Sequence, residues 1–157
     1  AIRGRHGSET VVLVCVLKGA VHFASDLLRA VGPPARIEFV RAKSYQGTAA
    51  SGILALEVSE ALELSGARVV VIEDVLDTGA TSAALLAALR ACDPASLELC
   101  VLLDKPGRRT HPIEPDYTGF VIGDEFVVGY GLDLDEAYRE LPAIYVLDTP
   151  ADYSTGT

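Results

Sequence analysis

The chain is 157 residues long, has a mass of 16.6 kDa and carries a formal net charge of −9 at pH 7. This length fits one domain with a sizeable hydrophobic core, and half of the residues are hydrophobic. The acidic balance argues against a surface that holds nucleic acid or anionic lipid by charge, but it leaves a phosphate ligand open, because backbone N–H groups can bind phosphate.

The N-terminal part predicts a buried strand followed by a helix. Val11–Leu17 is a continuous β-branched apolar run, typical of a strand that is buried on both faces of a parallel sheet. Lys18-Gly19 breaks this run. The apolar residues of Ala20–Val31 then recur at helical spacing, and Gly32-Pro33-Pro34 predicts the end of the helix.

Two more strands with a loop between them follow. Arg36–Arg41 predicts a second strand and Leu54–Val58 a third. The residues between them, 43–52, are small and polar, so we expect a mobile loop there.

The middle of the chain carries the clearest strand and helix pair. Arg68–Ile72 predicts a strand, and the acidic residues 73–79 after it end in a glycine. Ala80–Ala91 is rich in strong helix formers with a stripe of leucines, and it therefore predicts a helix. Leu97–Leu103 predicts another strand, and the Pro-, Gly- and charge-rich residues 104–115 predict a loop.

The C-terminal part predicts three shorter strands, at Tyr117–Ile122, Phe126–Val128 and Ile144–Leu147. Strands alternate with helices along the chain, which indicates an α/β fold with a mostly parallel sheet flanked by helices. The sequence contains no internal repeat and no clear linker, so we expect residues 1–157 to form a single domain.

Cysteine usage and hydropathy indicate a cytoplasmic protein. Cys15, Cys92 and Cys100 are far apart and form no CxxC pair, so we expect reduced thiols and no zinc site. No apolar stretch reaches the ~18 residues of a membrane span, so we expect no membrane partner. The chain contains no Met and begins at Ala1; we expect its N-terminal part to be truncated.

The residues richest in chemistry follow the fourth predicted strand. Glu73 and Asp74 stand at its carboxyl end, the edge where open parallel sheets bind ligands. The helix that begins at Ala80 directs free N–H groups out of the same edge, where they can bind phosphate, and Gly79 lets the backbone approach closely. We therefore expect Glu73 and Asp74 to bind sugar hydroxyls or a metal, and Asp77 to transfer a proton.

Two threonines, Thr78 and Thr81, add hydroxyl donors to this edge. In the alternative interpretation, Asp77 and Thr78 merely cap the helix, and Glu73 and Asp74 form a solvated turn. The convergence of several acids and hydroxyls on one sheet edge favours the ligand site. The sequence contains neither a Walker A loop nor a dinucleotide-binding glycine pattern.

Residues 73–81, with the sequence EDVLDTGAT, resemble the phosphoribosyl-pyrophosphate motif of the type I phosphoribosyltransferases. Four further segments are similar to segments of the hypoxanthine-guanine phosphoribosyltransferase family and occur in the family's order. They are Val16–Ala20, Lys43–Tyr45, Leu102–Pro106 and Glu125–Asp133. The resemblance covers nearly the whole chain, and it implies the family fold with a small hood subdomain built partly from the C-terminal segment.

The resemblance implies an activity, a cofactor and partners. The expected reaction transfers the 5-phosphoribosyl group from phosphoribosyl pyrophosphate to a 6-oxopurine, hypoxanthine or guanine, and gives IMP or GMP and pyrophosphate in purine salvage. The implied cofactor is Mg²⁺, and the implied assembly is a homodimer or homotetramer that binds no nucleic acid. The preference among hypoxanthine, guanine and xanthine stays open.

The same resemblance implies roles for the residues around pyrophosphate. Lys18 and Gly19 contact the pyrophosphate, in the family often through a non-proline cis peptide bond. Asp133 binds magnesium, for which Glu73 and Asp74 are further candidate ligands. Arg139 binds pyrophosphate and stabilises it as it leaves; in the alternative, it is a surface partner of Glu136 or Glu140 in a short helix.

The purine base is expected to lie beside Lys105, Phe126 and Val127. The Lys105 ammonium donates to O6, and a fixed cation there favours a 6-oxo base over a 6-amino base. Phe126 stacks on the base, and backbone groups of Val127 read its edge. A solvated surface lysine and a buried core phenylalanine are the alternatives.

Ser44 and Tyr45 lie in the predicted loop, which in the family closes over the site and excludes water during turnover. The 5′-phosphate is expected on residues 77–81, which include Gly79 and Ala80. Asp77 then accepts the proton from N7 of the purine as general base.

Three rival functions stay open at this point. The first is a regulator on the same fold that senses phosphoribosyl pyrophosphate, although a sensor needs no general base such as Asp77. The second is a phosphoribosyltransferase for xanthine, adenine or a pyrimidine. The third is a receiver domain, suggested only by Glu73-Asp74 after a strand.

Overall fold

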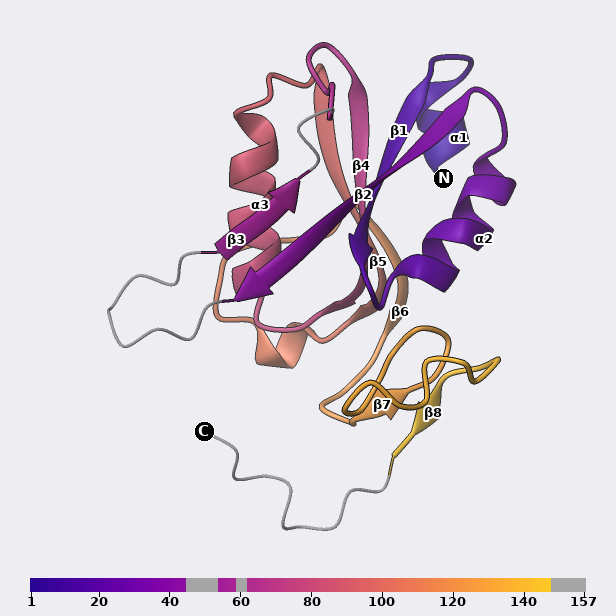
Figure 1. Cartoon of the computed structure of the whole chain (residues 1–157), viewed down its shortest axis with the longest axis vertical. Helices are drawn as coiled ribbons and strands as arrows, with labels where there is room; N and C mark the ends of the chain where they lie inside the picture. The colour runs from indigo at the N-terminus through magenta and orange to yellow at the C-terminus, as the bar shows by residue number, and fades with distance from the viewer. Residues whose placement is uncertain (45–53, 59–61, 148–157) are drawn as a thin grey trace.

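The main sheet has six strands in the computed structural model, which describes residues 1–44, 54–58 and 62–147 (Figure 1). The strands are β1 (Val11–Leu17), β2 (Ala35–Ser44), β3 (Leu54–Val58), β4 (Arg68–Leu76), β5 (Ser96–Asp104) and β6 (Tyr117–Val121). Their order in the sheet is β3-β2-β1-β4-β5-β6. All neighbours pair in parallel except β3, which pairs antiparallel with β2 at one edge. The predicted α/β class with a mostly parallel sheet is therefore confirmed.

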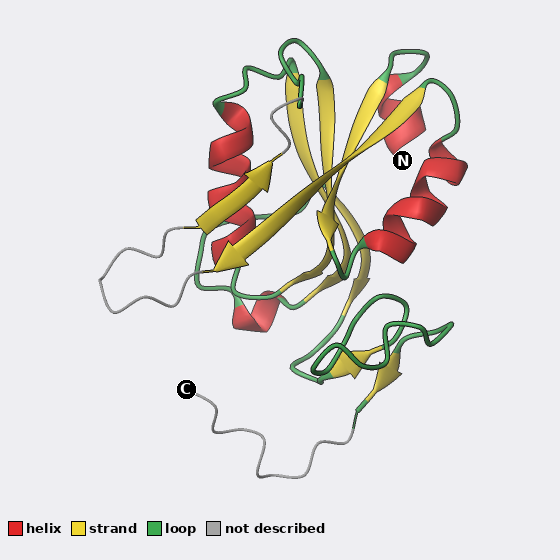
Figure 2. Ribbon diagram, viewed as in Figure 1, coloured by secondary structure: helices red, strands yellow, loops and turns green. Residues whose placement is uncertain are grey.

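Helices cover both faces of this sheet (Figure 2). The helices are α1 (Ile2–His6), α2 (Val21–Val31), α3 (Ala80–Arg90) and the short 3₁₀ helix η1 (Pro106–Arg108). Helix α3 lies on one face, and α1 and α2 lie on the other. A separate antiparallel pair, β7 (Val127–Val128) with β8 (Tyr145–Val146), lies beyond the carboxyl ends of the parallel strands (Figure 1).

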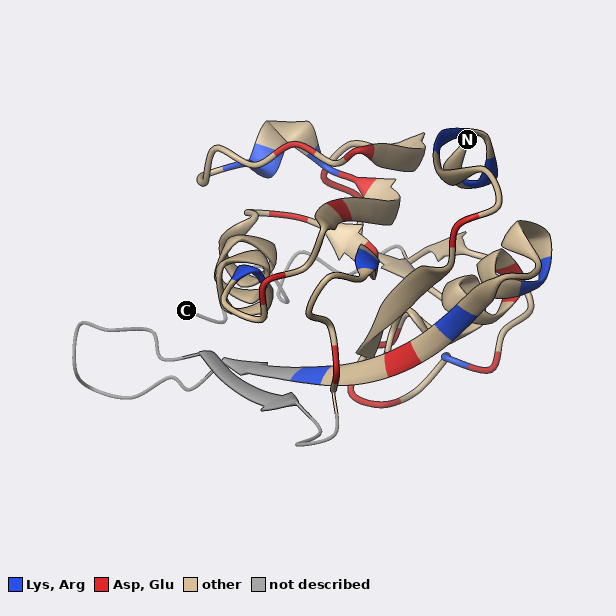
Figure 3. Cartoon of the chain, turned by 90° about the horizontal axis from the view of Figure 1, so that it is seen from above, with Lys and Arg blue, Asp and Glu red and all other residues tan. Residues whose placement is uncertain are grey.

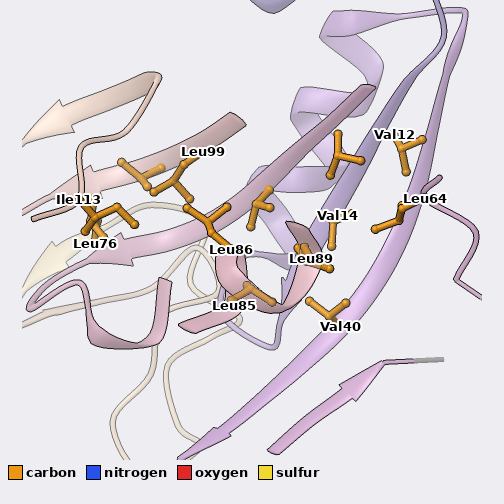
Figure 4. Packing of buried hydrophobic residues seen from close by; sticks show 13 residues of the cluster. Val12, Val14, Val40, Leu64, Leu76, Leu85, Leu86, Leu89, Leu99 and Ile113 are labelled. Carbon is orange, nitrogen blue, oxygen red and sulfur yellow. The ribbon is translucent and has the colours of Figure 1, made fainter. Parts of the chain in front are cut away.

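Alternate residues of the central strands belong to two different hydrophobic cores. In β1, Val12 and Val14 pack in the core beneath α3, whereas Val11, Leu13 and Cys15 pack in the core beneath α2. Figure 4 shows the first of these cores, where leucines of α3 meet side chains of the strands. This two-sided burial is the physical reason for the unbroken apolar run in the sequence.

The predicted bounds of β1 and β3 are confirmed, but β2, β4 and β5 are longer than predicted; β5 gains one residue at each end. Strand β2 continues to Ser44 because β3 pairs with its last five residues. Strand β4 continues to Leu76, which pairs with Asp104 of β5. Glu73 and Asp74 therefore lie within β4 rather than in a turn after it, and the alternative of a solvated turn is wrong.

Helix α1 was not among the predicted elements. It has five residues, too few for a hydrophobic period to be recognised. Its buried residues, Ile2 and His6, fix it to the sheet, and His6 Nε2 lies 3.0 Å from Glu98 Oε2 of β5.

Burial raises the pKa of the Cys15 and Cys100 thiols to about 12, so both side chains remain protonated core residues as predicted. Among the residues that the structure describes, no helix is long and apolar enough to cross a membrane.

Leu85→Ala should lower the free energy of unfolding by about 3 kcal/mol, because it leaves a cavity between α3 and the sheet. Leu85 is fully buried. Urea denaturation measures the loss. Val121→Ala is the control, since Val121 is 67% exposed and its truncation should change stability by less than about 0.5 kcal/mol. Equal losses in the two variants would contradict this packing.

Candidate functional site

A pocket of about 240 Å³ opens at the carboxyl end of β4, where the strand leads into α3. Its wall is formed by strand residues and by the turn that follows them. The lining residues are Val16, Glu73, Asp74, Val75, Asp77, Thr78, Gly79, Thr81 and Ser82. Six of these nine were predicted site residues, so the fold brings the acidic segment and the glycine turn together around one cavity.

The turn before α3 has the geometry of an anion site. Gly79 is the N-cap of α3 with φ 84°, a left-handed conformation that glycine adopts without a steric penalty. A Cβ at Gly79 would lie 2.5 Å from Ile113 Cγ2, so a larger residue would also collide with its neighbour. Ala80 is exposed at the first position of the helix, where unpaired N–H groups can bind phosphate.

Glu73 is a buried carboxylate at the wall of this pocket. It is 4% exposed, and its Oε2 accepts a hydrogen bond from Ser82 Oγ at 2.5 Å. Burial raises its pKa to about 7, against the opposing effect of the hydrogen bond from Ser82. Its other oxygen, Oε1, has no hydrogen-bond partner in the described part of the chain. The side chain therefore keeps one acceptor for a ligand.

Asp74 is held against the turn between β1 and α2. Burial raises its pKa, and the N–H of Val75, which donates to Asp74 Oδ1 at 3.0 Å, opposes that shift. A Cβ at Gly19 would lie 1.7 Å from Asp74 Oδ2. Only glycine at position 19 leaves room for this carboxylate. The preceding Leu17–Lys18 peptide bond is cis, as the resemblance led us to expect.

A second group of charges faces Asp74 from the segment before β8. Arg139 Nη2 lies 2.8 Å from Asp133 Oδ1, and Arg139 Nη1 donates to the Gly131 carbonyl. Arg139 lowers the pKa of Asp74 and Asp133 raises it, so the three side chains share one electrostatic environment. No helix forms here in the described structure, so the short helix of the alternative is wrong, whereas its pairing of Arg139 with Glu136 is present: Arg139 Nη2 lies 3.6 Å from Glu136 Oε1.

Glu136 links the Lys18 side chain to Arg139; the sequence named it only as an alternative partner of Arg139, and its contact with Lys18 was not predicted. Its carboxylate lies 2.8 Å from Lys18 Nζ and 3.6 Å from Arg139 Nη2. Lys18 is thus fixed beside the Asp133 segment, 118 residues away in sequence. The spacing in the sequence indicated its pairing with Arg139, but nothing indicated its contact with Lys18, which lies on a distant segment.

Asp77 is paired with a cation in this structure. Arg108 Nε donates to Asp77 Oδ1 at 2.7 Å, and both side chains are exposed. The next residue, Arg109, is nearly buried; it donates to the carbonyls of Leu76 and Asp77 and pairs with Asp104. Neither arginine was predicted, although both follow the predicted Lys105.

Lys105 and Phe126 lie on neighbouring segments beyond β5. Lys105 is 8% exposed and donates from Nζ to the Glu125 carbonyl at 2.7 Å, so the alternative of a solvated surface lysine is wrong. Phe126 is 41% exposed, which removes the alternative of a buried core residue. Val127 is half-buried in the same cluster as Val75.

Two predicted site residues, Ser44 and Tyr45, take part in none of the site contacts described above. Ser44 ends β2, while Tyr45 lies outside the described residues.

The described residues contain no group of three or more His, Cys, Asp or Glu side chains that could hold a metal ion by themselves. Acidic and basic residues are scattered over the strands and loops of the described part of the chain (Figure 3).

Comparisons with known proteins identify the family to which this chain is similar. Residues 2–135 match the model of the phosphoribosyl transferase domain family. The hypoxanthine-guanine phosphoribosyltransferase of Mycobacterium avium is 43% identical over 141 residues, which cover 89% of this chain and 70% of that protein. The hypoxanthine-guanine-xanthine phosphoribosyltransferase of Tritrichomonas foetus is 39% identical over 137 residues, 87% of this chain and 75% of that protein.

Solved structures show the same similarity. A hypoxanthine phosphoribosyltransferase from Staphylococcus aureus superposes with a TM-score of 0.89 at 39% identity, covering 98% of this chain and 83% of that one. The hypoxanthine phosphoribosyltransferase of Trypanosoma cruzi, in complex with the product IMP, gives a TM-score of 0.82 at 40% identity, with 90% and 76% covered. The fold of this chain is therefore that of known phosphoribosyltransferases.

Arg109→Ala should lower the free energy of unfolding by about 3 kcal/mol, because it leaves the nearly buried Asp104 carboxylate without its charge partner. It should also weaken binding of inorganic phosphate, since the Leu76 and Asp77 carbonyls lose the donor that holds the turn. Thermal unfolding and calorimetry measure the two effects. Arg108→Ala is the adjacent control: it breaks only an exposed pair and should leave the unfolding midpoint unchanged. A larger loss from Arg108→Ala would contradict the account.

Proposed function

The chain belongs to the hypoxanthine-guanine phosphoribosyltransferase family, and from this membership we propose that it transfers the 5-phosphoribosyl group from phosphoribosyl pyrophosphate to hypoxanthine or guanine. The products are IMP or GMP and pyrophosphate, and the reaction belongs to purine salvage. The observation that carries this proposal is 43% identity to such an enzyme over 89% of the chain. The pocket at the end of β4 supplies groups of the required chemistry.

The sugar phosphate fits the pocket by its hydrogen-bonding groups, because the turn before α3 supplies donors and the carboxylates of β4 supply acceptors. The 5′-phosphate binds the turn and first helical residues of α3, where N–H groups and the hydroxyls of Thr78 and Thr81 act as donors. The ribose hydroxyls lie against Glu73 and Asp74, whose carboxylates accept hydrogen bonds from them. Gly79 and Ala80 present no long side chain there, so the phosphate can reach the backbone.

The base lies on the hood side of the pocket. Lys105 is already oriented by the Glu125 carbonyl, and its remaining N–H groups can donate to O6 of a 6-oxopurine. Phe126 is exposed enough to stack on the base, and Val127 presents backbone groups to the base edge. The hood consists of residues 122–147 with β7 and β8, and we propose that it forms one domain with the sheet.

Pyrophosphate and magnesium are assigned to the charges around Arg139. Mg²⁺ in phosphate-transferring sites is usually bound by one or two carboxylates together with substrate phosphates. Asp133, whose charge acts on Asp74, fits that donor set, and Glu73, next to Asp74 in the sequence, is a further candidate. When bound, Mg²⁺ neutralises charge on pyrophosphate. Lys18, the Gly19 backbone and Arg139 bind the leaving group electrostatically.

Asp77 is the proposed general base. It accepts the N7 proton of the purine while N9 of the purine forms a bond to C1 of the ribose and the bond between C1 and pyrophosphate breaks. In this structure Asp77 pairs with Arg108, and both side chains are exposed. Breaking this ion pair so that Asp77 can contact the purine therefore costs little free energy. Ser44 and Tyr45 close over the site during turnover and exclude water. We further propose a cytoplasmic homodimer or homotetramer.

Asp77→Asn should lower kcat/KM for hypoxanthine about 10²- to 10⁴-fold, because the amide cannot accept the N7 proton. Nucleotide formation from phosphoribosyl pyrophosphate, Mg²⁺ and each of hypoxanthine, guanine, xanthine and adenine measures the effect and the base preference. Asp93→Asn, on the exposed turn after α3, is the control and should keep wild-type rates.

Full activity of Asp77→Asn would contradict the assignment of the base. Binding of phosphoribosyl pyrophosphate without turnover on any of the four bases would contradict the proposed reaction, and would favour the sensor on the same fold.

A further inference from the structure

Ser82 is a buried hydroxyl that no part of the proposed reaction uses. It is 3% exposed, lies in the first turn of α3, and lines the pocket beside Glu73. Its Oγ donates to Glu73 Oε2 at 2.5 Å. A hydroxyl in a buried site costs free energy unless it finds a partner, and here that partner is the carboxylate proposed to bind ribose.

The two oxygens of Glu73 have different environments. Oε2 is held by Ser82, whereas Oε1 is buried and has no hydrogen-bond partner among the described residues. Glu73 pairs with Val101 in the middle of the sheet, so its backbone cannot shift to find another donor. A buried acceptor without a partner is rare in proteins, and a ligand hydroxyl in the adjoining pocket would supply one.

The bond also links two subsites. Ser82 lies three residues after Gly79, on the helix turn assigned to the 5′-phosphate, whereas Glu73 lies on β4 at the ribose. The hydrogen bond therefore fixes the ribose acceptor relative to the phosphate donors. Without the hydroxyl, both oxygens of Glu73 lack a partner within the described structure, and the carboxylate is free to change rotamer.

We propose that Ser82 is a positioning residue: its hydroxyl holds the Glu73 carboxylate in the orientation that presents Oε1 to the ribose hydroxyls. This inference rests on the proposed function, since it takes the sugar of the substrate as the ligand of the pocket. Ser82 acts through Glu73 and does not itself contact the reacting atoms. The effect of its removal should therefore depend on the presence of ribose hydroxyls.

The test compares binding of IMP with binding of 2′,3′-dideoxy-IMP by calorimetry. Ser82→Ala should weaken IMP binding about tenfold, the effect expected when a charge-assisted hydrogen bond loses its alignment. It should leave the affinity for the dideoxy nucleotide unchanged. The dissociation constant of the dideoxy nucleotide divided by that of IMP, called here the affinity ratio, should therefore fall about tenfold. Steady-state kinetics should show a matching rise in KM for phosphoribosyl pyrophosphate with a smaller change in kcat.

Two further variants separate positioning from folding. Ser82→Cys keeps a weak donor of similar volume and should restore part of the preference for IMP over the dideoxy nucleotide. Ser96→Ala removes another buried serine hydroxyl, one without a hydrogen-bond partner in the described structure, and should leave the ratio at the wild-type value. Thermal unfolding of each variant reports on the fold.

An equal loss of affinity for both nucleotides, or no loss for either, would overturn the proposal and leave Ser82 with a structural role only. IMP synthesis by the wild-type chain is measured in the same experiments. Its absence would count against the proposed function, whereas an active wild type with an unchanged affinity ratio in Ser82→Ala would count against Ser82 alone.

Discussion

Two adjacent carboxylates, Glu73 and Asp74, are buried at the end of a parallel strand, and the rest of the site is arranged around them. Ser82 satisfies one oxygen of Glu73, and the absence of a side chain at Gly19 makes room for Asp74. A Cβ at Gly131 would lie 2.1 Å from the Gly19 carbonyl, so the hood also packs against this turn through glycine. The end of β4, the turn at Gly19 and the hood segment at Gly131 are therefore packed closely together around the two acids.

The segment after β5 supports this arrangement from the other side. Arg109 holds the backbone of Leu76 and Asp77, and the N–H groups of Thr110 and His111 both donate to the Thr78 carbonyl. The turn that presents donors to the phosphate is therefore fixed before a ligand arrives. A site that is preorganised in this way loses less conformational entropy when it binds its ligand.

Features that depend on residues close together in the sequence could be predicted, whereas features that depend on contacts between distant residues could not. The bounds of β1 and the position of α3 depend on local patterns of apolar residues, and the acids at the end of β4 follow from chain order in a parallel sheet. The extra length of β4, by contrast, depends on pairing with β5. The partners of Asp77, Lys18 and Glu73 depend on side chains brought together by folding. Nothing in the sequence identified Arg108 or Ser82, and Glu136 was named only as a possible partner of its near neighbour Arg139.

The central claim is that the pocket at the end of β4 holds the ribose phosphate, and a crystal structure with GMP and Mg²⁺ tests it most directly. The account predicts the 5′-phosphate on residues 78–81, the ribose hydroxyls at Glu73 and Asp74, and the base beside Lys105 and Phe126. A nucleotide bound instead in the apolar groove between α2 and β6, whose walls include Phe23 and Phe120, would contradict it.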